Sequence, residues 1–261
     1  MTSKTTRHKL SDWLALHELD PTLCRQVLRA AVKEVGSQST DQVELAVGAD
    51  AQSPDAAWRA VVDAMCAFFP SQQGVIEETF RGISKIISNN DDRGGRALTL
   101  DHGDLSYPTI IYKYAGSVSD ALVIAHEFGH ALQIVLSEKK FVSPIVREVC
   151  AFASEAILLK RLQETDRARH ERFAQVWRSY SRKYLLSDGH ILKVALNDPD
   201  ASYKYGWNYP IARYLAEHVS REFTPERLWT VFQGNLSVRQ IIDDLGHDRV
   251  RQMRPGTPQG K

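Results

Sequence analysis

Hydrophobic side chains recur at helical spacing through most of the chain, but a short central stretch alternates as β-strands do. Ser53-Pro54 is a typical helix start, and the helix after it has an apolar stripe through Trp58 that we interpret as core. Another helix is predicted to follow Pro70 and to continue through Ile87. It ends at the polar turn of residues 89–95.

Strands are predicted on both sides of this region. Residues 43–47 alternate as a short strand, and residues 96–100 and 107–114 read as two further strands. Pro108 fits best at the start of a strand or on a sheet edge, because proline cannot donate a backbone hydrogen bond.

The remaining elements are predicted to be helices, several of them marked by a capping residue followed by proline. Their expected positions are residues 21–35, a helix capped by Ser117 or Ser119, residues 144–163, the polar stretch 166–184, the aromatic-rich stretch 203–214, and two short helices capped at Thr224 and Ser237. The sequence therefore predicts a mainly α-helical fold with a small β-sheet.

The composition of the chain argues against nucleic acid and membranes as binding partners. The chain has 261 residues, 43% of them hydrophobic, which is enough for one sizeable core, and its formal net charge of +1 gives no general attraction to nucleic acid or to an anionic membrane. The three cysteines are scattered, and no apolar signal segment stands near the first residue. We therefore expect a cytoplasmic protein that binds neither nucleic acid nor membrane, and its oligomeric state stays open.

The segment that carries chemistry is His126-Glu127-Phe128-Gly129-His130. On a helix, His126 and His130 project from the same face, so both imidazoles can bind one zinc ion. Glu127 beside them can act as a general base toward a water that the zinc activates. Apolar residues surround the motif, which predicts a buried helix. The alternative is a chance match to this motif on a core helix. The rest of the sequence must decide between a zinc site and a chance match.

A third ligand is needed, because catalytic zinc usually has three protein ligands and one open position. A histidine six residues after His130 would be one solution, but that residue is Leu136. Glu148 and Glu155 are seven residues apart on the next helix and therefore share one face. Periodicity does not choose between them, and an exposed acidic edge is the alternative to a ligand.

Four segments together resemble the thimet oligopeptidase and oligoendopeptidase F family of zinc peptidases, in a short, minimal form. Residues 107–116 are similar to the strand that precedes the family's metal helix, and residues 119–131 to that helix. Residues 148–155 are similar to its third-ligand helix, in which two glutamates also stand seven apart. Residues 205–209, Tyr-Gly-Trp-Asn-Tyr, fall where the family has a tyrosine-rich substrate-binding segment.

The resemblance implies a zincin-like catalytic domain over residues 51–246. Helix signals predict an N-terminal helical segment (1–50) before it, and the basic, Pro- and Gly-containing residues 247–261 predict a disordered tail after it. It also implies one zinc ion per chain, held by His126, His130 and Glu148. Glu155 would orient a histidine ligand.

The remaining implied roles concern a peptide substrate. Tyr209, or else Tyr205, would donate to the oxyanion that forms during hydrolysis. The backbone of Ile110, Ile111 and Tyr112 would pair with an extended peptide by strand addition. Three hypotheses follow: a zinc-dependent metallopeptidase of short peptides, a specialised hydrolase with one dedicated peptide or amide substrate in a biosynthetic or host-interaction pathway, and a non-catalytic zinc-bearing scaffold that binds peptides.

Overall fold

The computed structural model describes residues 8–36, 52–88, 97–104 and 106–252, with side chains described as far as residue 246. The predicted mainly helical class with a small sheet is confirmed. The helices in the first part of the chain are α1 (Leu10–Leu16), α2 (Pro21–Gly36), α3 (Pro54–Phe68), the 3₁₀ turn η1 (Pro70–Gln72) and α4 (Gln73–Gly82). Those in the second part are α5 (Val118–Ser137), α6 (Pro144–Thr165), α7 (Arg167–Arg182), the π-helical turn η2 (Lys183–Asp188), α8 (Gly189–Ala195), the 3₁₀ turn η3 (Tyr205–Trp207), α9 (Asn208–Glu222), α10 (Pro225–Phe232) and α11 (Val238–Gln252).

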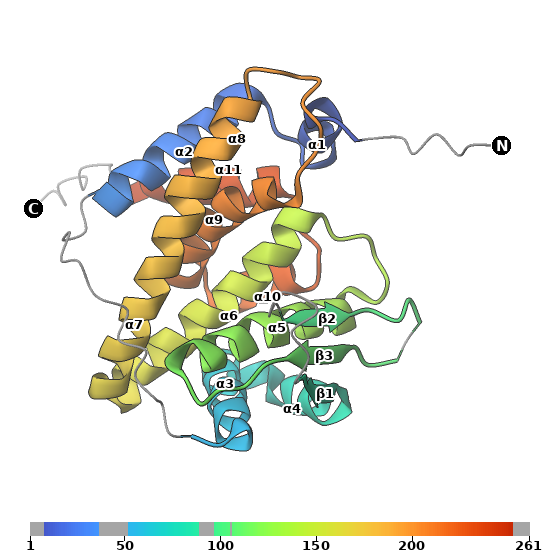
Figure 1. Cartoon of the computed structure of the whole chain (residues 1–261), viewed down its shortest axis with the longest axis vertical. Coiled ribbons are helices and arrows are strands. Elements are labelled where there is room, and N and C mark those ends of the chain that lie inside the picture. The colour runs from blue at the N-terminus through green and yellow to red at the C-terminus, as the bar shows by residue number, and fades with distance from the viewer. Residues whose placement is uncertain (1–7, 37–51, 89–96, 105, 253–261) are drawn as a thin grey trace, which may run out of the picture.

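Two central helices organise the molecule. Helix α6 packs along α5 on one side and along α9 on the other, and the small sheet lies beside α5 (Figure 1). One continuous cluster of buried hydrophobic side chains extends from Leu10 in α1 to Leu245 in α11. The N-terminal helices α1 and α2 therefore share the core of the rest of the chain.

Local sequence signals explain where several helices begin. The hydroxyl of Ser53 accepts a hydrogen bond from the backbone of Ala56 before α3, and the hydroxyl of Thr224 accepts one from Arg227 before α10. Helix α5 begins after Ser117, whose backbone N–H donates to the carboxylate of Asp120. Each of these contacts satisfies a backbone or side-chain group that the first helical turn leaves without a partner.

The sheet has three strands in the order β1-β3-β2. Strand β1 (Ser84–Ile87) runs parallel to β3 (Thr109–Tyr112), and β2 (Leu98–Leu100) runs antiparallel to it. Because β3 lies between the other two strands, its backbone groups are used on both sides. The strand addition expected at Ile110, Ile111 and Tyr112 is therefore wrong, because these residues do not offer a free backbone edge to a peptide.

The prediction that one helix continues from Pro70 through Ile87 is also wrong. Helix α4 ends at Gly82, Ile83 is extended, and the following residues form β1. A Cβ on Gly82 would lie 2.4 Å from the ring of Tyr107, so only glycine lets the chain pass this close to the segment leading into β3. Pairing with β3 then outweighs the helical spacing of the isoleucines.

Some predictions fall at the limits of the described residues. The expected strand at residues 43–47 and the domain boundary at residue 50 lie outside them. Helix α11 reaches Gln252, six residues into the predicted tail, and residues 253–261 also lie outside. Within the part of the chain that the structure describes, no helix is both long enough and apolar enough to cross a lipid bilayer.

Candidate metal centre

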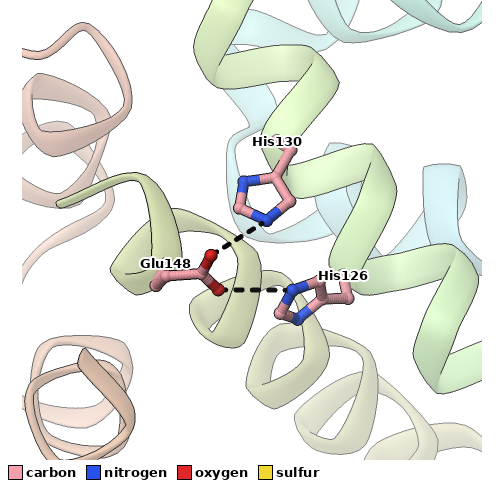
Figure 2. Close-up of side chains that lie close together, drawn as sticks. All are labelled: His126, His130 and Glu148. Atoms are coloured by element: carbon pink, nitrogen blue, oxygen red, sulfur yellow. Dashed lines mark ion pairs between the residues drawn. The ribbon is translucent and has the colours of Figure 1, made fainter. Parts of the chain in front are cut away.

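Helices α5 and α6 bring three potential metal ligands together. His126 and His130 project from one face of α5, and Glu148 on α6 points between them, with one carboxylate oxygen toward each imidazole (Figure 2). The Nε2 atom of His126 lies 3.4 Å from one oxygen of Glu148, and the Nε2 atom of His130 lies 3.7 Å from the other. One donor atom from each of the three residues lies within 4.8 Å of the other two.

These separations fit a tetrahedral metal ion. Two ligands that are each about 2.1 Å from a zinc ion at a tetrahedral angle lie about 3.4 Å from each other. Glu148 is 3% exposed, and its Oε2 atom makes no hydrogen bond within the described residues. A buried carboxylate oxygen without a hydrogen bond is costly, and a cation between it and the imidazoles would remove that cost. Two imidazoles and one carboxylate are also a donor set that zinc prefers.

The electrostatics of the group favour positive charge at this point. Burial lowers the pKa of His126, but the carboxylates of Glu148 and Glu155 outweigh burial and raise that pKa to about 10. Burial raises the pKa of Glu148, but the charges of the two histidines outweigh it and lower that pKa to about 2. The carboxylates therefore hold a cation next to them, which is the condition that a divalent metal ion requires.

Glu155 contacts His126 on the side of its ring that faces away from Glu148. Its Oε1 atom lies 2.8 Å from Nδ1 of His126, the ring nitrogen that faces away from Glu148, and its Oε2 atom accepts a 2.7 Å hydrogen bond from Nη1 of Arg213. The two glutamates on one face of α6 thus make different contacts. Glu155 fixes the orientation of the His126 ring and does not lie among the three donors.

Arg213 on α9 is completely buried and ends this chain of contacts. Its guanidinium donates to the hydroxyl of Ser181 and to the backbone carbonyl of Trp177, and it stacks 4.0 Å from the ring centroid of Trp177. A buried arginine is stable only when its charge and its donors are satisfied, as they are here. Three helices, α6, α7 and α9, therefore support the orientation of His126.

Glu127 is held by the edge strand of the sheet. It is 7% exposed, and its Oε2 atom accepts a 2.6 Å hydrogen bond from the hydroxyl of Thr99 on β2. Leu98 and Leu100 point to the opposite, exposed side of the strand, because side chains alternate along β2. The strand that fixes this carboxylate is thus one of the two outer strands of the sheet, and no other described strand covers its outer edge.

The two candidate tyrosines make different contacts. The phenol of Tyr205 on η3 donates a 2.7 Å hydrogen bond to Oε1 of Glu148. Burial and the charge of Glu148 raise the pKa of that phenol, which therefore stays protonated and able to donate. The ring of Tyr209 packs against Tyr184 and Tyr205, with centroid distances of 5.2 and 5.7 Å.

Gly129, inside the motif, sets the distance between α5 and α6. A Cβ on this residue would lie 2.6 Å from the hydroxyl of Ser154 and 2.8 Å from backbone atoms of Cys150 and Ala151 on α6. Only glycine allows the two helices to approach this closely. The approach is what brings Glu148 within reach of both histidines.

Two residues of the site, Thr99 and Arg213, were not among those predicted from the sequence. Thr99 is a polar residue between two leucines in a predicted strand. Side chains alternate along a strand, so Thr99 faces the opposite side from the two leucines. Arg213 stands in the run Ile211-Ala212-Arg213-Tyr214-Leu215, and a charge inside an apolar run was the available signal.

Comparison with known proteins adds evidence at the level of the fold. No family model matches the chain, and no curated protein matches its sequence. Two solved structures are similar in fold: a candidate peptidase from Chlamydophila abortus (TM-score 0.55, 12% identity) and a candidate oligoendopeptidase F from Bacillus anthracis strain Ames (TM-score 0.53, 13% identity). The matches cover 94% and 93% of this chain.

The chain has the zincin-like fold of these two proteins. It spans 57% of the first neighbour and 53% of the second, a little over half the length of each. The predicted zincin-like architecture is therefore confirmed as a fold.

Proposed function

We propose that the protein is a zinc-dependent metallopeptidase that hydrolyses peptide bonds of short peptides. The observation that carries the proposal is the convergence of His126, His130 and Glu148 next to a buried carboxylate, Glu127, that a hydrogen bond holds in place. A site that only holds a metal for structural reasons has no use for such a carboxylate. The similarity in fold to candidate peptidases is consistent with this function.

A zinc ion bound here would supply a Lewis acid that polarises the peptide carbonyl and acidifies a water molecule. The protein's own groups do the rest. Glu127 accepts the proton of the attacking water and passes it to the leaving nitrogen, while the Thr99 hydroxyl keeps its carboxylate oriented. Tyr205 or Tyr209 donates a hydrogen bond to the oxygen on which negative charge develops.

The peptide is proposed to bind along β2 rather than β3. The outer edge of β2 is not paired with another described strand, and Thr99 in its centre contacts Glu127. An extended peptide that pairs with this edge would lie beside the proposed base. The strand addition expected from the sequence thus moves to the neighbouring strand.

The test is hydrolysis of a mixed library of short peptides, with cleavage sites read by mass spectrometry. The wild-type protein should contain one zinc ion per chain, and chelation should abolish hydrolysis until zinc is restored. Glu127→Gln should keep the metal but lose most turnover, because glutamine preserves the shape and removes the base. Full activity in Glu127→Gln, or no hydrolysis of any peptide by the zinc-loaded protein, would refute the proposal.

A further inference from the structure

A pocket of about 470 Å³ lies beside the three candidate ligands without including them. The end of α5, the loop that leads into α6, the start of α6 and the segment after β2 surround it. Its inner wall includes Gln133, Ile134, Val142 and Arg147. Five charged side chains at its mouth, three acidic and two lysine, are all exposed.

This pocket adjoins the candidate centre on both helices. Gln133 and Ile134 follow His130 by one helical turn on α5, so their side chains lie next to that histidine along the same face. Arg147 directly precedes Glu148 on α6, so the side chain that follows it in the chain belongs to the candidate centre. A substrate whose cleaved bond is at the centre would therefore reach the pocket within one or two residues.

Two polar side chains in the wall have donor or acceptor groups that no described residue pairs with, and one of them is buried. Gln133 is 2% exposed, and its amide oxygen makes no hydrogen bond within the described residues. Arg147 as a whole residue is half-buried, and its guanidinium forms no ion pair with any residue in the described part of the chain. It is the one charged lining residue that is not exposed.

We propose that this pocket binds a carboxylate of the peptide substrate, with Arg147 as the anion-binding residue and Gln133 as the group that pairs with the adjoining peptide unit. The proposal rests on the function proposed above. A guanidinium binds a carboxylate through two parallel hydrogen bonds, which favours it over neutral groups. The amide of Gln133 can accept from a peptide N–H and donate to a peptide carbonyl, because rotating it by half a turn exchanges its oxygen and nitrogen.

The carboxylate has two sources, the free C-terminus or the side chain of Asp or Glu. The test therefore uses one cleavable peptide in three forms: with a free C-terminus, with an amidated C-terminus, and amidated with Glu at successive positions on either side of the cleaved bond. For each form, kcat/KM is measured with the zinc-loaded full-length protein, with Arg147→Gln and with Arg147→Lys. The control is Arg178→Gln, a change to an exposed arginine on α7 that does not line the pocket.

For the wild-type protein and the control we expect kcat/KM to be 10- to 100-fold higher with the carboxylate than with the amide, the range for a hydrogen bond to a charged group. This ratio should fall to near one in Arg147→Gln, and Arg147→Lys should keep only part of it. If the peptide with the free C-terminus is preferred, the pocket binds the C-terminal carboxylate. If the amidated peptide with Glu is preferred, the pocket binds a side-chain carboxylate. Equal values for all forms in the wild-type protein, or an unchanged ratio in Arg147→Gln, would overturn the inference.

Binding measured without turnover separates this inference from the proposed function. Calorimetry with zinc-loaded Glu127→Gln, with and without Arg147→Gln, reports the carboxylate preference even if no peptide is cleaved. A preference that depends on Arg147 without any cleavage by the wild-type protein would refute the proposed function and retain the carboxylate site. Cleavage by the wild-type protein without any carboxylate preference would retain the proposed function and refute the carboxylate site.

Discussion

Glu148 and Glu155 lie on one face of α6, and only their contacts distinguish them. Glu148 faces both Nε2 atoms, whereas Glu155 contacts Nδ1 of His126 and pairs with Arg213. We therefore expect Glu148→Ala to lose zinc almost completely. Glu155→Ala should retain zinc with an affinity reduced 10- to 100-fold, as is typical for residues that orient a ligand.

The measurement is zinc content after identical dialysis against buffers of graded zinc concentration. Glu164→Ala is the matched control, because Glu164 is an exposed residue of the same helix. An empty Glu155→Ala protein beside a loaded Glu148→Ala protein would reverse the two assignments.

The tyrosines call for a second prediction at the level of single residues. The family resemblance favours Tyr209 as the oxyanion donor, but the structure shows the phenol of Tyr205 donating a hydrogen bond to Glu148, a proposed ligand. We expect Tyr205→Phe to lower kcat about 10²-fold with little change in KM, since the lost hydrogen bond forms in the transition state. Steady-state kinetics of Tyr205→Phe and Tyr209→Phe on one peptide compare the two, and a larger loss of kcat in Tyr209→Phe would return the role to Tyr209.

At the level of elements, the packing of α5 on α6 depends on one missing methyl group. Gly129→Ala would push its Cβ against backbone atoms of α6, which cannot move aside as a flexible side chain can. We expect the free energy of unfolding to fall by about 1–3 kcal/mol, the usual cost of overpacking a core, and zinc affinity to fall with it. Chemical denaturation and zinc titration measure the two effects.

Gly74→Ala is the control for this substitution. Gly74 lies in α4, and no atom lies within 4 Å of the position that its Cβ would take. That change should leave stability unchanged or raise it slightly, because alanine is the better helix former. Equal effects of the two substitutions would show that Gly129 does not set the helix spacing.

The elements also show what the sequence can and cannot predict. Helix starts at Pro54, Pro144 and Pro225 follow from local capping chemistry, and the spacing of the two histidines follows from helix geometry. Strand β1 was not predictable, because the spacing of its isoleucines also fits a helix and the pairing that decides between them is with a distant strand. Thr99 and Arg213 were missed for the same reason, since the groups they contact are far away in sequence.

At the level of the whole molecule, one buried histidine links stability to pH. His17 at the end of α1 is 1% exposed, and burial lowers its pKa from 6.5 to about 4. Between those pH values His17 binds a proton in the unfolded chain but not in the folded protein. The free energy of unfolding therefore falls as the pH falls from 6.5 toward 4. The loss amounts to about 3 kcal/mol for a difference of this size.

The free energy of unfolding, measured by denaturation between pH 7 and pH 4, should therefore fall less steeply in His17→Gln than in the wild-type protein. His190→Gln, which changes an exposed histidine on α8, should leave the slope unchanged. Parallel slopes for the wild-type protein and His17→Gln would show that His17 does not contribute to the acid sensitivity.

The buried guanidinium on α9 has a consequence for how the protein would acquire the proposed zinc ion. Arginine stays charged at any pH that the protein meets, so Arg213 attracts Glu155 whether or not an ion is bound. Glu155 in turn fixes the His126 ring, and Gly129 fixes the distance from α5 to α6. The scaffold is thus assembled by contacts that do not involve an ion, and a zinc ion, if the site binds one as proposed, would meet ligands already arranged around its position. Uptake and release of zinc should then be exchange reactions of a folded protein, unlike the coupled folding and binding of small zinc domains.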